Sequence, residues 1–274
     1  MKKNKRKIFF TGIVITAIIV AMIGCKTKYD SDKTKTEETR PSIMVGCDDY
    51  TPFSYMDVDG NLTGIDVELA MEAFDRMGYQ ADFTFINWEE KKELLKEGTI
   101  DCVWSSFTMD GRGDEYKWAG PYMKSNQVVA VNTDSDINTL DDLNDKTIAV
   151  QSTTKPEDLF RNHEAGMPKF RKVISVKNRD LLFTFLSKGY VDAIAAHDTS
   201  IVQFSQDFDM KYRILKEPLL EVNLGVAFDL NDNRGLDKQL AQVIKEMRAD
   251  GTIKDVANKY LPNADRYLED ADEE

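Results

Sequence analysis

The sequence predicts an α/β protein with two lobes, each built on a parallel-rich sheet with flanking helices. Residues 41–262 form the expected folded part, in which short apolar runs alternate with amphipathic segments. This alternation is typical of parallel α/β sheets. A folded part of about 220 residues serves either one large domain or two modest ones. A segment that occurs twice in similar form favours two.

The strand and helix signals follow one another along the chain. Strands are expected at residues 43–47, 83–86, 100–104, 147–150, 173–176 and 191–196. Helices are expected at residues 66–77, 89–97, from 156, around 181–186, 236–247 and 253–260. A turn is expected at Asp59-Gly60, and Asp66 is expected to cap the first helix. That helix has an apolar face at helical spacing, made of Val67, Ala70, Met71, Phe74 and Met77.

The N-terminal residues have the layout of a secretory signal. Five basic residues precede an apolar stretch of 16 residues at 8–23, shorter than the roughly 20 that span a bilayer. The run Met22-Ile23-Gly24-Cys25 resembles the lipobox of bacterial lipoproteins, with Met22 where Leu is usual. The resemblance implies cleavage before Cys25 and a diacylglyceryl group on its sulfur; the alternative is an uncleaved anchor helix. Either arrangement puts the body at the outer face of the cell membrane.

Composition limits the partners. Residues 25–41 are mostly polar and are expected to form a disordered tether. The formal net charge is −12, and removal of the five basic residues of the signal makes it −17. Such an acidic surface argues against nucleic acid as a partner. Cys47 and Cys102 lie in strand-like apolar runs, where buried thiols are favoured over a disulfide, although an oxidising compartment would allow one.

The repeated segment indicates where a ligand would bind. Residues 95–103 (LKEGTIDCV) align without gaps with residues 186–194 (LSKGYVDAI), each copy reading as a helix end, a glycine stop and a strand. Ser105-Ser106 and His197-Asp198 would then follow parallel strands at their carboxyl ends, where open α/β sheets bind ligands. Two such ends facing each other would form a cleft.

Five segments, in matching order and spacing, resemble the family 3 solute-binding proteins of polar amino-acid ABC transporters. They are residues 45–53 (VGCDDYTPF), 64–70 (GIDVELA), 118–122 (WAGPY), 140–143 (LDDL) and 247–252 (MRADGT). The resemblance implies a periplasmic-binding-protein type II fold, in which two α/β lobes joined by two crossing strands close on one amino acid. The crossing segments are expected at residues 127–131 and 221–224.

The chain is accordingly expected to divide into six parts. They are a signal peptide at 1–24, the tether at 25–41, lobe 1 at 42–128, lobe 2 at 129–221, the return of lobe 1 at 222–262 and an acidic tail at 263–274. The expected function is capture of a free polar amino acid by a monomer and its delivery to an ABC transporter permease. Sensing without transport and, less favoured, an enzyme on the same fold are the alternatives.

Burying a free amino acid requires partners for its carboxylate and its ammonium group. Arg112 is assigned to the carboxylate, because a guanidinium offers a bidentate fork. In the family pattern an Arg follows the Ser/Thr-rich strand end, although the loop from Thr108 to Arg112 is one residue shorter than usual. Backbone N–H groups at Thr153 and Thr154, just before Pro156, are expected to face the same carboxylate. Helix capping by Thr154 is the other interpretation.

The ammonium group is expected to bind the carbonyls of Ser105 or Ser106, the Thr108 hydroxyl and an acid of the second lobe. In most relatives this acid lies five residues after the Asp of the motif at 189–192, a position that here is His197. Asp198, one residue later, is favoured after a one-residue bulge, because a buried ammonium needs a carboxylate nearby. In the rival interpretation His197 faces the cleft.

The side chain of the ligand is expected to contact Asp48, Tyr50, Phe53 and Trp88. In the family an aromatic pair sandwiches the ligand, and the acid at the position of Asp48 reaches a polar or cationic end. Phe53 fits a core position equally well. Asp48 favours a ligand with donor groups, such as Gln, His, Arg, Lys or cystine, over an aliphatic one.

Other chemistry finds little support in the residues. Residues 57–61 with Glu68 superficially resemble a calcium loop, but Leu62 stands where that loop requires Gly. The two histidines are not at metal spacing, and neither a nucleophile elbow nor a Gly-rich phosphate loop occurs. No metal, cofactor or catalytic residue is therefore expected.

Overall fold

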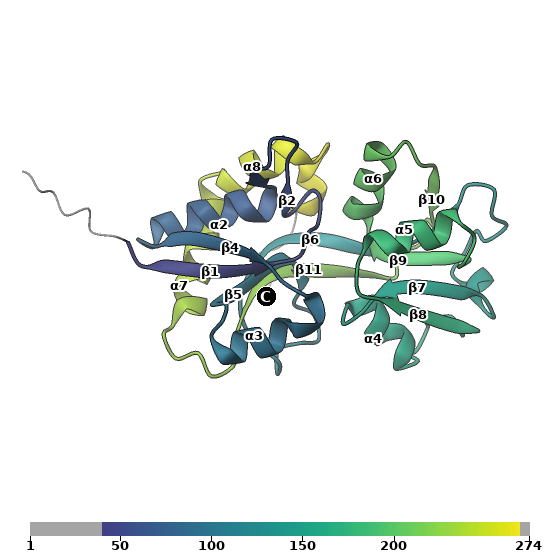
Figure 1. Cartoon of the computed structure of the whole chain (residues 1–274), viewed down its shortest axis with the longest axis horizontal. Coiled ribbons are helices and arrows are strands. Elements are labelled where there is room, and N and C mark those ends of the chain that lie inside the picture. Colours follow the sequence, from purple (N-terminus) through teal and green to yellow (C-terminus); the bar gives the residue numbers. More distant parts are fainter. Residues whose placement is uncertain (1–39, 269–274) are drawn as a thin grey trace, which may run out of the picture. The chain divides into compact units, whose positions relative to one another are not determined.

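A computed structural model describes residues 40–268, which form a mixed α/β unit (Figure 1). The strands are β1 (Ser42–Cys47), β2 (Tyr55–Met56), β3 (Leu62–Thr63), β4 (Gln80–Phe85), β5 (Cys102–Thr108), β6 (Lys117–Asn132), β7 (Thr147–Gln151), β8 (Lys172–Val176), β9 (Ala193–His197), β10 (Tyr212–Ile214) and β11 (Leu220–Phe228). The helices are α2 (Ile65–Arg76), α3 (Lys91–Glu97), α4 (Lys155–Arg161), α5 (Asp180–Ser187), α6 (Asp198–Asp207), α7 (Leu236–Ala249) and α8 (Thr252–Tyr260). The 3-10 helices are η1 (Trp88–Glu90), η2 (Asp141–Leu143) and η3 (Ala264–Tyr267). The expected signal peptide, Cys25 and nearly all of the tether lie outside the described residues.

Hydrogen bonds link the strands in the order β4-β1-β5-β11-β6-β9-β7-β8, with β10 also on β6. In the first half of the sheet β1 pairs in parallel with β4 and β5, and in the second half β7 pairs in parallel with β8 and β9. The antiparallel strands β6 and β11 lie between these groups (Figure 1). Two sheets joined by crossing strands were expected. The ladders form one continuous path because β6, at 16 residues, pairs with β11 up to Gln127 and with β9 from Gln127 onward.

Each half has its own buried apolar clusters. Helices α2, α7 and α8 cover one face of the first half, and α3 covers the other (Figure 1). In the second half one cluster includes residues of α4 and another includes residues of α5 and α6. The clusters change between Met123 and Val128 along β6 and between Leu219 and Leu220 near β11. This change supports the expected lobe boundaries near residues 128 and 221, which we retain as a proposal.

Most expected helices and strands are confirmed, with differences at α2 and at the C-terminus. Gly64, not Asp66, precedes α2, and the Asp66 side chain is buried instead of capping the helix. Met71, expected on the apolar face, is 56% exposed. The acidic tail was expected from residue 263, but Ala264 and Tyr267 of η3 are buried in the first-half core, so the polar end starts later.

The two cysteines of the body are separate buried thiols. Cys47 and Cys102 are both free, which confirms the favoured interpretation. Burial raises the pKa of the Cys47 thiol to about 12. Within residues 40–268, no helix is long and apolar enough to cross a membrane.

Gly64 provides a test of the junction that begins α2. Its φ is 125°, and a Cβ at this position would lie 2.3 Å from the Phe53 carbonyl oxygen. Gly64→Ala is therefore expected to lower the free energy of unfolding by about 2 kcal/mol or more, measured by chemical denaturation, because the backbone must move. Gly78→Ala is the control, since its φ of 83° is also left-handed but nothing lies within 4 Å of the added Cβ. Equal losses for both variants would contradict the steric explanation.

Candidate functional site

A cavity lies between the two halves of the described chain. About 440 Å³ of space free of protein atoms lies within it, part of which is open solvent. Its wall consists of Tyr50, Trp88, Ser105, Ser106, Phe107, Thr108, Arg112, Gln127, Gln151, Thr153, Thr154, Lys155, Pro156, Arg179, Leu182, Ala195, Ala196 and His197. Many of these residues follow the carboxyl ends of β5, β7, β8 and β9, as parallel sheets lead one to expect.

The cavity brings together most of the site residues expected from the sequence. Those in its wall are Tyr50, Trp88, Ser105, Ser106, Thr108, Arg112, Thr153 and Thr154. The wall does not include Asp48, Phe53 or Asp198. Phe53 is fully buried in the first-half core, in line with the core interpretation.

A buried carboxyl group fixes the end of β5. Asp66 Oδ2 accepts a hydrogen bond of 2.6 Å from the backbone N–H of Ser106, which has a positive φ of 47°. Burial raises the pKa of Asp66 to about 7. Ser105 Oγ accepts from the Asp48 backbone N–H at 3.0 Å, so this hydroxyl holds the chain, whereas buried Ser106 Oγ has no hydrogen-bond partner among residues 40–268. The Ser106 hydroxyl is therefore available to a ligand.

Arg112 is buried in the wall, as expected for a carboxylate-binding residue. Its Nη2 donates to Asp158 Oδ2 at 2.8 Å, and its Nη1 donates to the Thr108 carbonyl at 3.3 Å. The Asp158 side chain, on α4 of the other half, is 45% exposed. A half-exposed carboxylate returns to water at small cost, so a ligand carboxylate can take its place on Arg112.

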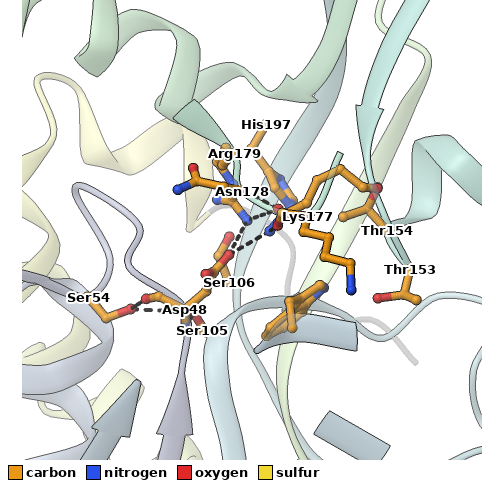
Figure 2. A network of polar contacts seen from close by, with 12 residues as sticks. Asp48, Ser54, Ser105, Ser106, Thr153, Thr154, Lys177, Asn178, Arg179 and His197 are labelled. Atoms are coloured by element: carbon orange, nitrogen blue, oxygen red, sulfur yellow. Dashed lines mark hydrogen bonds and ion pairs between the residues drawn. The ribbon is translucent and has the colours of Figure 1, made fainter. Parts of the chain in front are cut away.

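Arg179 is a second arginine of the wall, which the sequence analysis missed. Its Nε and Nη2 donate to Gln151 Oε1 at 3.0 and 2.6 Å, and its Nη2 lies 3.2 Å from Asp48 Oδ2. Its guanidinium stacks on Tyr50, 3.2 Å from the ring centroid. Figure 2 shows the Asp48 carboxylate directed at Arg179, with Ser54 and Ser105 on its other side. Asp48 therefore already has a cationic partner.

The chain before α4 offers fewer N–H groups than expected. The Ser152 N–H donates to the Val176 carbonyl at 2.9 Å, and the Thr153 N–H donates to Glu157 Oε2 at 2.6 Å. Thr154 directly precedes α4, but its hydroxyl donates backward to the Gln151 carbonyl at 2.6 Å and does not cap the helix. In this structure the Thr153 N–H thus serves Glu157 and not the cavity.

His197, and not Asp198, faces the cavity. The pairing of β9 with β6 is regular through Gln127 and His197, so the bulge expected before Asp198 is absent. The His197 ring bonds Gln127 Nε2 and Ser125 Oγ, both at 2.8 Å. Burial, with Arg179 and Arg112 nearby, lowers the pKa of His197 to about 3, so the ring is neutral.

Asp198 lies on the far side of this strand end. It begins α6, and its Oδ2 accepts from Arg266 Nη2 at 2.9 Å and from the Tyr267 hydroxyl at 3.3 Å. The expected position of Asp198 in the ligand cleft is therefore corrected: the residue links α6 to η3. The cavity wall therefore contains no acid for an ammonium group.

Lys91 is a buried cation directly behind the wall and was not predicted. Its Nζ donates to the Thr153 hydroxyl at 2.7 Å and to the Trp88 carbonyl at 3.0 Å, and lies 4.7 Å from the Trp88 ring centroid. Burial, followed by repulsion from Arg112, lowers the pKa of Lys91 to about 7. The carboxylates that oppose this shift belong to Asp158, Glu115 and Asp48. Since Thr153 lies in the other half, the bond also connects the halves.

Two α/β halves, two crossing strands and a cavity between them define a two-lobed binding protein of the type II fold. The chain belongs to the bacterial extracellular solute-binding proteins, family 3, whose model matches residues 43–263. The match confirms the resemblance seen in the sequence.

The similar proteins bind amino acids, as their names state. The L-cystine-binding protein TcyJ of Escherichia coli is 26% identical over 254 residues, which cover 91% of this chain and 93% of that protein. The histidine-binding periplasmic protein of Escherichia coli is 29% identical over 230 residues, covering 80% and 87%. A solved ancestral arginine-binding protein bound to arginine has a TM-score of 0.73 at 25% identity, covering 82% of this chain and 100% of that one.

Lys91 gives the protein a measurable pH dependence of stability. In the folded protein the pKa of Lys91 is lowered to about 7, whereas the ordinary lysine pKa is about 10.4. Between these two pH values the unfolded chain therefore binds more protons than the folded protein. The free energy of unfolding of the parent, relative to Lys91→Met, is therefore expected to rise between pH 7 and 10 in denaturant titrations. Lys92→Met, whose lysine side chain is 58% exposed, is the control and should show no such change. Parallel pH profiles of Lys91→Met and the parent would contradict the assignment.

Proposed function

We propose that this protein captures a free amino acid in the cavity between its halves and delivers it to an ABC transporter permease. The main support is Arg112, a buried guanidinium in the wall whose carboxylate partner is half exposed and replaceable. The family match and the amino-acid-binding relatives support the same conclusion. In this proposal the halves close around the ligand by motion about β6 and β11.

The proposed roles follow from the contacts. Arg112 binds the α-carboxylate in exchange for Asp158, and the hydroxyls of Ser106 and Thr108 add hydrogen bonds. Tyr50 and Trp88 contact the rest of the ligand. Side chains of Ser105, Thr153 and Thr154 hold the wall in place, since each is engaged in a protein hydrogen bond.

The ammonium group needs an acceptor other than Asp198. Gln127 Oε1 lies in the wall, is buried and has no hydrogen-bond partner within the described part of the chain. We assign the ammonium group to Gln127, with the carbonyls at the end of β5 as further acceptors. Neutral His197 orients the Gln127 amide through its ring nitrogen.

Attachment to the membrane is a further part of the proposal. A lipid on Cys25 and the polar tether would hold a monomer at the outer face of the cell membrane, within reach of the permease. We propose binding without catalysis, in line with the family of solute-binding proteins to which the chain belongs.

Calorimetric titration of the full chain in detergent with the twenty amino acids and cystine tests the binding function. At least one is expected to bind with a micromolar or lower dissociation constant, and binding by none would refute the proposal. Uptake of that amino acid in cells with and without the gene then separates transport from sensing, because only transport predicts lost uptake.

Arg112→Lys tests the carboxylate assignment. Lysine keeps the charge but lacks the bidentate fork, so we expect affinity to fall by about 2 kcal/mol or more, roughly thirtyfold, in calorimetry. Arg171→Lys is the matched control, because Arg171 is outside the wall and its side chain is 63% exposed. Unchanged affinity of Arg112→Lys would show that another residue holds the carboxylate.

Cys25→Ser tests the anchor. We expect the variant to be lost from the membrane fraction and to incorporate no labelled palmitate, because the thiol is the proposed site of lipid attachment. Cys47→Ser is the control, since this buried cysteine lies in the folded body. Membrane retention of both variants with equal labelling would refute lipidation at Cys25.

A further inference from the structure

The charges of the cavity wall are strongly unbalanced. Three wall residues are cationic, namely Arg112, Lys155 and Arg179, and none is acidic. Buried Lys91 adds a cation that bonds the wall residue Thr153. A ligand with a positively charged side chain would be repelled by every charged residue of the wall.

The carboxylates nearest the wall are already engaged. Asp48 contacts Arg179 and Gln151, and Asp158 contacts Arg112. Asp66 accepts the Ser106 N–H and Glu157 accepts the Thr153 N–H, so both serve the backbone. Asp48 is thus not placed to select a ligand with a cationic side chain.

Arg179, a residue of the wall, has one donor nitrogen without a partner among the described residues. Its Nε and Nη2 are bonded, but buried Nη1 has no hydrogen-bond partner within residues 40–268. The side chain is 11% exposed, and the stack on Tyr50 with the two bonds to Gln151 fixes the plane of the guanidinium. A buried guanidinium nitrogen without an acceptor is costly, and a carboxylate oxygen is its best partner.

The two arginines belong to one site. Both lie in the same wall, and both repel a proton from His197, so they are within electrostatic range of one ring. Arg112 accounts for one carboxylate of a ligand, which leaves the donor on Arg179 for another acidic group. A second carboxylate would also balance the ammonium group, for which the wall offers only neutral acceptors.

We propose that Arg179 forms a second carboxylate-binding position, so that the preferred ligand is an amino acid with two carboxylates. The second carboxylate belongs either to an acidic side chain or to the other end of a cystine-like molecule. This inference rests on the proposed function, since Arg112 must bind the first carboxylate. Of the ligands that Asp48 favoured in the sequence, only cystine has two carboxylates and remains a candidate.

The first test compares ligands on the full chain in detergent by calorimetry. L-Glutamate and L-aspartate offer a side-chain carboxylate, L-cystine offers a second α-carboxylate, and L-glutamine is the neutral match of glutamate. We expect glutamate, aspartate or cystine to bind roughly ten- to a hundredfold more tightly than glutamine, arginine, lysine or histidine. The ligand that binds most tightly shows whether the second carboxylate comes from an acidic side chain or from the other end of cystine. Tighter binding of glutamine or a cationic amino acid would overturn the inference but leave the proposed function intact, whereas binding of no amino acid would overturn both.

The second test removes the charge of Arg179. Arg179→Gln is expected to weaken binding of the two-carboxylate ligand roughly ten- to a hundredfold, and binding of glutamine by less than about threefold. Arg171→Gln removes the same charge from an exposed position of the same half and should change neither. An equal loss for both ligands would mean that Arg179 only holds the halves together, which would overturn the inference.

A third variant tests whether Asp48 competes with the ligand for Arg179 or holds the ligand itself. Asp48→Asn keeps the shape of the side chain but removes the charge that competes for Arg179, so binding of the two-carboxylate ligand should be unchanged or tighter. Melting temperatures of each variant establish that it is folded. A tenfold or greater loss in folded Asp48→Asn would show that Asp48 itself holds the ligand, and the inference would fail.

Discussion

The antiparallel ladder between β6 and β11 is the constraint on which the rest of the structure depends. It joins two halves that each have their own apolar clusters, and it places the cavity between them. The ladder ends at Gln127, which also begins the ladder of β6 with β9. Gln127 therefore sits at once at the junction of the halves and in the wall of the cavity. A ligand that bonds Gln127 would contact the hinge directly.

Much of this fold follows from local sequence patterns, because β-branched apolar runs indicate strands and segments with apolar residues at helical spacing indicate helices. The repeated segment also placed the end of β9 to within one residue, whereas β5 continues through Ser105 and Ser106 to Thr108. The 16-residue β6 was harder to recognise, since it includes Gly120, Pro121 and several polar residues that its partners on both sides make tolerable. The role of Asp66 was hidden for a similar reason: an acid at a helix start resembles a cap, and only the fold shows that it holds Ser106.

The candidate site was predictable where a residue follows a strand end, and unpredictable where register decides. The residue that faces the cavity, His197, differs from the expected one, Asp198, by a single position. No pattern near residues 193–198 signals whether a bulge is present. Arg179 follows β8 and Gln151 is the last residue of β7, so the rule that located Ser105 and Ser106 would have found them had it been applied to every strand. Lys91 gave no such signal, because a lysine in a short charged helix normally faces solvent.

The charged contacts between the halves differ greatly in what they contribute. Lys177 with Glu89 and Arg266 with Asp198 each include a well-exposed cation, so each adds little to closure. Arg179 with Asp48 and Lys91 with Thr153 are largely buried, and opening the halves would return two cations to water. Desolvation therefore opposes the closed arrangement at these cations, most clearly at Lys91, whose pKa is lowered. A ligand that brings negative charge between the halves reduces that cost, so closure and the choice of ligand depend on the same buried cations.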